Sequence, residues 1–390
     1  MLVPRLILLL WLAAPQPRVE RELTEAAGLL AKGSVAETIT LLRGIVKAHP
    51  RNAKAHLLLG SALALAPRRE EAIQELTRAV ELQPDSAPTH NTLGTALARF
   101  AEFDRARKAF ETAARLDPKW VDPHLNLALV LAQNNEIAVA GDEVARATAL
   151  CGTCPQAAYL QYVQGKLYDK QNRTEQAVAA FESAIRLRPD FPDAYLDLSA
   201  VKLKMGDEEK AVQALETAVR LAPRNGEARY RLGAEYLKRN NAAGAVEQLR
   251  EAYRLLPEDR GVLYNLARAL RASGQPGDAD TIQRKLADHL QSSAQASEQM
   301  FTAGKLNVEG MNLERSGQYA DAVDKYRAVL RIDPLAGPVR RNLGLALCRM
   351  GRWEAGIAEL RETLRLYPED AETTRALYIA LDQQAAAAGR

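Results

Sequence analysis

Prolines recur along this chain at a fixed interval, and that interval constrains the fold more than any other feature of the sequence. Nine of them define it: Pro50, Pro84, Pro118, Pro155, Pro189, Pro223, Pro257, Pro334 and Pro368. Six of the eight intervals are 34 residues long, one is 37 and one is 77. A period of this length indicates an array in which each repeat is one supersecondary unit.

Small residues recur in register with these prolines. When each proline is set at position 32 of a 34-residue frame, the chain forms ten frames, and position 8 is small in every one: Ala26, Gly60, Gly94, Ala128, Gly165, Ser199, Gly233, Ala267, Gly310 and Gly344. Position 20 is alanine except at Thr38 and Gly356, and position 24 is a larger apolar residue except at Gln283. The frames therefore share one packing pattern.

This pattern predicts two antiparallel helices in each frame. All 18 prolines lie at frame boundaries, in turns or in the N-terminal leader, so none interrupts a helix. Small residues at positions 8 and 20 let the two helices approach closely, and we expect positions 24 and 27 to pack against the neighbouring frame. One hairpin cannot bury its apolar face alone, but a stack of hairpins forms a continuous core.

These positions resemble those of the tetratricopeptide repeat family, with small residues at 8, 20 and 27, a bulky one at 24 and proline at 32. The resemblance covers residues 19–370. It implies an all-α protein, a right-handed α-solenoid of about ten tetratricopeptide helical hairpins. The tail from Ala371 predicts a C-terminal capping helix that covers the last apolar face.

Two insertions and one further position suggest how the array is divided. Extra residues precede Pro155 and follow the eighth frame, and position 7 is leucine in seven frames but polar at Glu25, Gln164 and Glu309. Each polar residue lies in a frame that we expect to open a block. The predicted domains are repeats 1–4 (19–157), repeats 5–8 with an extended last helix (158–302), and repeats 9–10 with the capping helix (303–390).

The N-terminus carries a short apolar run that we interpret as a signal peptide over residues 1–14. Leu6–Ala14 follows one basic residue and precedes two prolines. The run is too short to span a bilayer, and the rest of the chain has no apolar stretch of roughly 20 residues. Export to the periplasm or the extracellular space is predicted; the alternative is an apolar tail on a cytoplasmic protein.

Charge and motifs exclude several functions. The net charge is +3, from 52 basic and 49 acidic residues, and no run of like charge could track a nucleic-acid backbone. The sequence contains no nucleophile elbow, phosphate-binding loop, zinc-protease helix or dinucleotide fingerprint. We therefore expect no enzymatic activity, no cofactor and no nucleic-acid partner.

Three cysteines allow at most one disulfide. Cys151 and Cys154 end a predicted helix, where the helix dipole disfavours a reactive thiolate. Zinc needs a second ligand pair, and only Cys348 remains, so no metal site is predicted. In an exported protein the pair is expected to form a local structural disulfide.

Histidines at position 4 of three consecutive frames raise a second question about metals. His56, His90 and His124 would line one face of the array. Neighbouring helices in a stack lie about 8–10 Å apart, and no carboxylate recurs beside these histidines to complete a site. The interpretation we favour is packing, as for the ring of Tyr195 at the same position.

The resemblance also implies a binding face, because in this family the first helices line a concave groove. Tyrosine, arginine, lysine and asparagine gather at its groove positions in frames 5 to 10: Tyr159, Tyr162, Lys166, Tyr230, Arg231, Tyr264, Asn265, Arg268, Arg271, Asn307, Arg341 and Asn342. Aromatic residues and arginine concentrate binding energy at protein interfaces. The alternative is a solvated face with internal salt bridges.

The resulting hypothesis is a protein–protein interaction scaffold. The expected partner is a protein or an extended peptide with acidic residues or a free carboxylate. The alternative is an accessory subunit of an envelope enzyme or assembly complex, with a redox-sensitive joint at Cys151 and Cys154.

Overall fold

The structure, a computed structural model, describes residues 17–388, and these residues form helices and turns without a strand. The predicted signal peptide, residues 1–14, lies outside them. The chain divides into two compact units, the first ending at Arg239 and the second beginning at Asn240. This division falls within the predicted second block.

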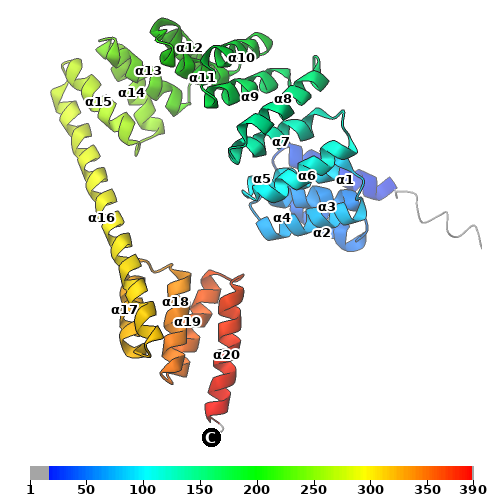
Figure 1. The fold of residues 1–390 in the computed structure, drawn as a ribbon, viewed down its shortest axis with the longest axis vertical. Helices are drawn as coiled ribbons and strands as arrows, with labels where there is room; N and C mark the ends of the chain where they lie inside the picture. The colour runs from blue at the N-terminus through cyan, green and yellow to red at the C-terminus, as the bar shows by residue number, and fades with distance from the viewer. Residues whose placement is uncertain (1–16, 389–390) are drawn as a thin grey trace, which may run out of the picture. The chain divides into compact units, whose positions relative to one another are not determined.

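The first unit is a stack of helical hairpins (Figure 1). Its helices are α1 (Pro17–Ala31), α2 (Val35–Ala48), α3 (Ala53–Leu65), α4 (Arg69–Leu82), α5 (Ala87–Arg99), α6 (Phe103–Leu116), α7 (Val121–Gln133), α8 (Ile137–Cys151), α9 (Ala157–Lys170), α10 (Thr174–Leu187), α11 (Pro192–Lys204), α12 (Glu208–Leu221) and α13 (Gly226–Lys238). Each odd-numbered helix up to α11 packs against the even-numbered helix that follows it.

The second unit continues the same architecture. Its helices are α14 (Ala242–Leu255), α15 (Arg260–Ala272), α16 (Pro276–Arg315), α17 (Tyr319–Ile332), α18 (Gly337–Arg349), α19 (Trp353–Leu366) and α20 (Ala371–Ala388). The prediction of an all-α solenoid of helical hairpins is thus confirmed. No helix within residues 17–388 is long and apolar enough to cross a membrane.

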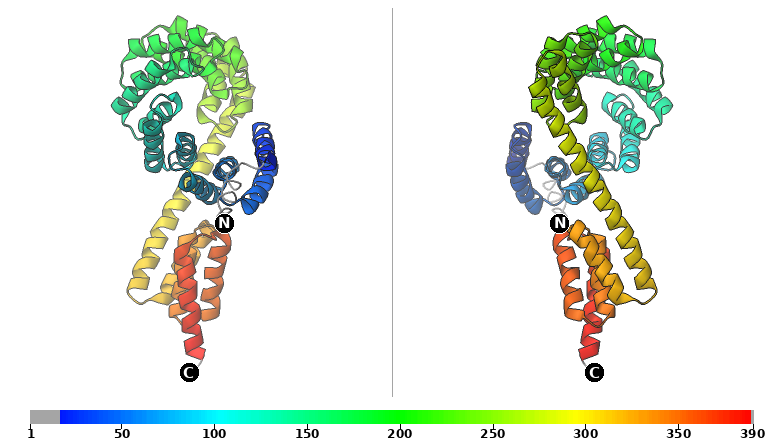
Figure 2. Two further views of the ribbon diagram at one scale, coloured as in Figure 1. Left: turned by 90° about the vertical axis from the view of Figure 1, so that its right-hand side faces the viewer. Right: turned by 90° about the vertical axis from the view of Figure 1, so that its left-hand side faces the viewer.

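Helix α16 is one unbroken helix of 40 residues (Figure 2). It supplies both the second helix of the eighth repeat and the first helix of the ninth. The extended last helix that the sequence predicts for the eighth repeat is therefore present. Gln283 occupies position 24 here and is exposed, and residues 294–302 are exposed on every side of the helix. The middle of α16 therefore lacks the packing that surrounds the other helices.

Helix α20 closes the array. Ala376 and Ala380 on α20 are buried in one cluster with Ile357 and Leu360 of α19. Asp370 accepts hydrogen bonds from the backbone N–H and the side chain of Thr373, at 3.0 and 2.6 Å, and so caps the start of α20. The predicted capping helix is confirmed.

The turn inside each repeat has one recurring backbone conformation. In the residues that the structure describes, position 15 of every frame has a positive φ: Gly33, Pro67, Ala101, Asn135, Asn172, Gly206, Asn240, Gly274, Gly317 and Gly351. Eight of these ten are glycine or asparagine, the residues that adopt the left-handed region at least cost. Each hairpin therefore turns at the same point of the repeat.

Close contact between positions 8 and 24 holds several of the hairpins together. A Cβ atom added to Gly94 would lie 2.6 Å from the ring of Phe110, and one added to Gly165 would lie 2.7 Å from the ring of Phe181. The same relation holds between Gly310 and Tyr326 at 2.8 Å. Only a residue without a side chain lets these helices approach to that distance.

This contact adds to one expectation from the sequence. Position 24 is expected to pack against the neighbouring repeat, and in the structure Phe110 lies against Gly94 of its own hairpin as well. Phe110 also shares a buried cluster with Leu127 and Leu131 of the following hairpin. A large side chain at position 24 thus fills the space inside its hairpin and reaches the next one.

The Gly94 contact yields a testable prediction. We expect Gly94→Ala to lower the free energy of unfolding by about 1–3 kcal/mol, because the new methyl group overpacks the hairpin. Gly28→Ala in α1 is the matched control, since its Cβ would meet nothing within 4 Å, and should stabilise the helix by up to about 1 kcal/mol. Urea unfolding followed by circular dichroism measures both. Equal stability of the two variants would contradict the packing.

Candidate functional site

Tyr159 and Tyr162 on α9 form part of an aromatic cluster. Their ring centroids lie 5.9 Å apart, and the Tyr162 ring lies 4.9 Å from that of Phe191 and 5.9 Å from that of Phe181. The Tyr162 hydroxyl donates a hydrogen bond of 2.9 Å to Asp197 on α11. Tyr162 therefore links the fifth repeat to the sixth.

Burial of Tyr162 and the nearby charge of Asp197 raise the pKa of its phenol, so the hydroxyl remains a hydrogen-bond donor. Lys166 lies one turn further along α9 and is exposed, with its ammonium nitrogen 5.4 Å from the centre of the Tyr162 ring. Lys166 is thus the outermost of the three predicted residues on α9.

Tyr230 and Arg231 on α13 are both partly buried. The Arg231 guanidinium forms an ion pair of 2.5 Å with Glu227, one turn earlier on the same helix. The positive charge of Arg231 is therefore already paired with a carboxylate of the same helix. The alternative interpretation of this face, a solvated surface with internal salt bridges, predicts such a pair.

Helix α15 carries the most exposed of the predicted aromatic residues. Tyr264 is 54% exposed, and the guanidinium carbon of Arg268 lies 5.6 Å from the centre of its ring. Arg268 also donates a hydrogen bond of 3.4 Å to Asn265. Arg271, in contrast, is held by Asp280 on α16 at 2.8 Å. The structure thus brings Tyr264, Asn265 and Arg268 together on one accessible surface.

The three residues predicted in the last two repeats lie apart from that surface along the chain. Arg341 on α18 forms ion pairs with Asp370 at 3.4 Å and with Glu372 at 2.7 Å, and so ties α18 to the start of α20. Asn342 is partly buried beside it. The side-chain oxygen of Asn307 on α16 is buried and has no hydrogen-bond partner among the described residues.

A contact between position 4 and the preceding proline was not predicted. The carbonyl oxygen of that proline accepts a hydrogen bond from the side chain at position 4 in four repeats: His56 to Pro50 at 3.1 Å, His90 to Pro84 at 2.8 Å, Arg229 to Pro223 at 2.7 Å and Arg340 to Pro334 at 2.9 Å. The sequence feature that could have predicted this contact is the recurrence of hydrogen-bonding side chains at position 4.

Two of the three histidines at position 4 also contact a glutamate at position 23. His56 lies 2.5 Å from Glu75, and His124 lies 2.7 Å from Glu143. His56 and His124 are both buried. No group of three or more metal-ligating side chains was found within residues 17–388. His56 and His124 thus each join the two helices of their own hairpin.

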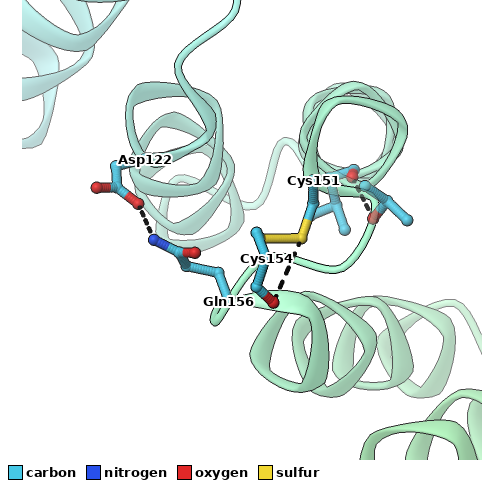
Figure 3. The surroundings of a disulfide bond; sticks show 6 residues. Asp122, Cys151, Cys154 and Gln156 are labelled. Atoms are coloured by element: carbon cyan, nitrogen blue, oxygen red, sulfur yellow. Dashed lines mark hydrogen bonds between the residues drawn. A yellow bond between two sulfur atoms is a disulfide. The ribbon is translucent and has the colours of Figure 1, made fainter. Parts of the chain in front are cut away.

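The sulfur atoms of Cys151 and Cys154 are bonded at the end of α8 (Figure 3). Their Cα atoms lie 5.0 Å apart, and Gly152 between them has a φ of 53°. Gln156, just beyond, donates a hydrogen bond of 2.9 Å to Asp122 on α7. The third cysteine, Cys348, is buried, and burial raises the pKa of its thiol.

A stack of hairpins held by small-residue contacts, with ion pairs on its surface, defines a repeat scaffold. One family model described as tetratricopeptide repeat matches residues 23–87, 91–158, 230–288 and 307–371, and a second such model matches residues 170–235. The chain belongs to the tetratricopeptide repeat family. Its fold is that of a protein–protein interaction scaffold.

One solved structure supports the fold, and a second shows similarity alone. A tetratricopeptide repeat protein from Parabacteroides merdae is 13% identical, with a TM-score of 0.51 over 65% of this chain and 98% of that one. The pilF protein of Pseudomonas aeruginosa is 18% identical, with a TM-score of 0.47 over 54% of this chain and 94% of that one. No curated protein matches the chain in sequence.

The ion pairs of Arg341 lead to a prediction on pH. Burial opposes the charged form of Asp370, but hydrogen bonds from Thr373 and the charge of Arg341 outweigh it and hold the pKa of this carboxyl below its usual range. A lowered pKa stabilises the fold above the unfolded value of about 3.9, and the gain is lost as pH falls through the lower folded value.

Asp370→Ala should therefore cost about 1 kcal/mol at pH 7 through loss of the helix cap. The difference from the wild-type protein should shrink as pH falls below about 4. Thermal unfolding between pH 3 and 7 measures this difference. The control is Glu369→Ala, a change at the exposed residue next to Asp370. A difference that stays constant over this range would show that the charge of Asp370 contributes nothing.

Proposed function

We propose that the chain binds an extended segment of a protein partner on the first-helix face, with Tyr264 and Arg268 as the anchor. The exposed aromatic ring of Tyr264 carries the proposal, since the guanidinium of Arg268 lies beside it. Such a pair offers a large apolar surface and a positive charge at little cost in side-chain ordering.

Charge supports a partner with acidic residues or a free carboxylate. Arg231, Arg271 and Arg341 each meet an internal carboxylate. Arg268 makes no ion pair with any residue in the described part of the chain, so its guanidinium is open to an incoming carboxylate. The function proposed for this surface is capture of a partner, with no catalytic step.

Crosslinking and capture from the native host test this proposal. We expect the double variant Tyr264→Ala, Arg268→Ala to lose a specific crosslinked band that the wild-type protein gives. The control is Tyr378→Ala, Arg375→Ala on α20, another exposed tyrosine and arginine one turn apart, and it should retain that band. Identical bands from all three proteins would remove the α15 surface from consideration.

We also propose that the protein is exported and that the Cys151–Cys154 joint is oxidised in its compartment. The bonded sulfur atoms support this, because disulfides persist in oxidising compartments. The alternative function, an accessory subunit of an envelope complex with a redox-sensitive joint, depends on the same bond.

Mass spectrometry of protein from the native host, alkylated before and after reduction, tests export and oxidation together. The envelope or extracellular fraction should contain a chain lacking residues 1–14, with one free thiol at Cys348 and two thiols that appear after reduction. A cytoplasmic chain with three free thiols would contradict both proposals. Partner capture by the double variant Cys151→Ser, Cys154→Ser then distinguishes the two roles of the disulfide. Unchanged capture indicates a structural bond, and altered capture indicates a redox-sensitive joint.

A further inference from the structure

Position 7 has a polar residue in three repeats, and the structure shows how these positions differ from the others. Leu127 and Leu198, at this position on α7 and α11, are buried. Glu25 on α1 is exposed, in the first helix of the described chain, and Glu309 forms an ion pair of 2.7 Å with Lys325. Gln164 on α9 is the remaining polar residue, and α8 packs directly before it. A polar residue at a packed position indicates that the packing there is incomplete.

A cleft of about 650 Å³ opens at Gln164. Helix α8 contributes Ile137, Ala138, Gly141 and Ala145 to its wall, and α9 contributes Gln164 and Tyr168. The volume falls in the range of about 300–1,000 Å³ that small-ligand sites occupy. The cleft lies wholly inside the first unit and shares no residue with the α15 surface.

Gly141 explains why the cleft exists. It occupies position 21, where Val178, Val212 and Val323 of other repeats are buried. A Cβ atom added to Gly141 would meet nothing within 4 Å, so the space that a valine fills elsewhere is empty here. Glycine within a helix costs about 0.5–1 kcal/mol relative to alanine, and no close contact requires it at this position.

The rim of the cleft is polar and carries one charge of each sign. Asp142 on α8 contributes a carboxylate, and Arg173, just before α10, contributes a guanidinium. Arg173 is held in place, because its guanidinium carbon lies 4.6 Å from the centre of the Tyr168 ring and its Nη1 donates to Gln171 at 3.2 Å. The amides of Gln164 and Gln171 complete the rim.

We infer that this cleft binds an extended peptide segment of a protein partner that carries an apolar side chain next to a basic residue. The apolar side chain occupies the space above Gly141 and Ala138, and the basic residue faces Asp142. The amides of Gln164 and Gln171 can both donate to and accept from a peptide backbone, and Arg173 faces its carbonyl groups. The site is additional to the α15 surface and does not rest on it.

Selection from a phage-displayed library of random decapeptides tests the inference, with the full-length protein as bait. A Cβ atom at Gly141 meets nothing within 4 Å, and leucine favours the helix, so Gly141→Leu should fold and place an apolar side chain in the cleft. Gly44→Leu is the matched control, since Gly44 is also a glycine in the second helix of a repeat and its added Cβ would meet nothing within 4 Å. Circular dichroism confirms that both variants are folded.

The enriched peptides should carry an apolar residue beside lysine or arginine. In fluorescence anisotropy they should bind the wild-type protein and the Gly44→Leu variant equally, and the Gly141→Leu variant at least about tenfold more weakly. Asp142→Asn should weaken binding and reduce its dependence on salt. Loss of the α15 pair, Tyr264 and Arg268, should leave this binding unchanged.

Three outcomes would overturn the inference. The first is enrichment only of peptides that lack the apolar and basic pair. The second is equal binding of enriched peptides to wild-type protein and Gly141→Leu. The third is the absence of any enriched peptide. None of them bears on the function proposed for the α15 surface, which rests on the capture of partners through Tyr264 and Arg268.

Discussion

The close approach of two helices at position 8 is the contact on which the rest of this structure depends. Gly94, Gly165 and Gly310 each face a large ring of their own hairpin at a distance that excludes any side chain. That contact sets the spacing inside a hairpin, and the ring on its far side reaches the next hairpin, as Phe110 does toward Leu127. Because each repeat buries its apolar face only against its neighbours, a continuous core results.

The polar contacts follow the same period. Side chains at position 4 donate to the carbonyl oxygen of the preceding proline in several repeats, as His90 does to Pro84. Cations on the first helices are in large part paired with carboxylates, as Arg271 is with Asp280. Arg268 has no such carboxylate among the described residues, and it lies beside the exposed ring of Tyr264, so these two residues are candidates for contact with a partner.

The fold could be predicted from sequence because the features that specify it recur. Proline spacing and the small residues at positions 8 and 20 appear in every part of the chain, and each occurrence supports the others. The binding surface could not be predicted in the same way. Whether Arg341 is open or paired depends on Asp370 and Glu372, which lie 29 and 31 residues away in the chain. Gly141, whose missing side chain opens the cleft, departs from the pattern and so carried no signal of its own.

Native-state hydrogen exchange along the whole chain tests most directly whether packing within the hairpins, rather than local helix propensity, holds these helices. Isolated helical segments are marginal in water, and residues 294–302 of α16 are helical but exposed on every side. Amides in this segment should exchange much faster than those in α15 and α17, which pack against the two ends of α16. Equal protection of residues 294–302 and of these neighbouring helices would contradict the account.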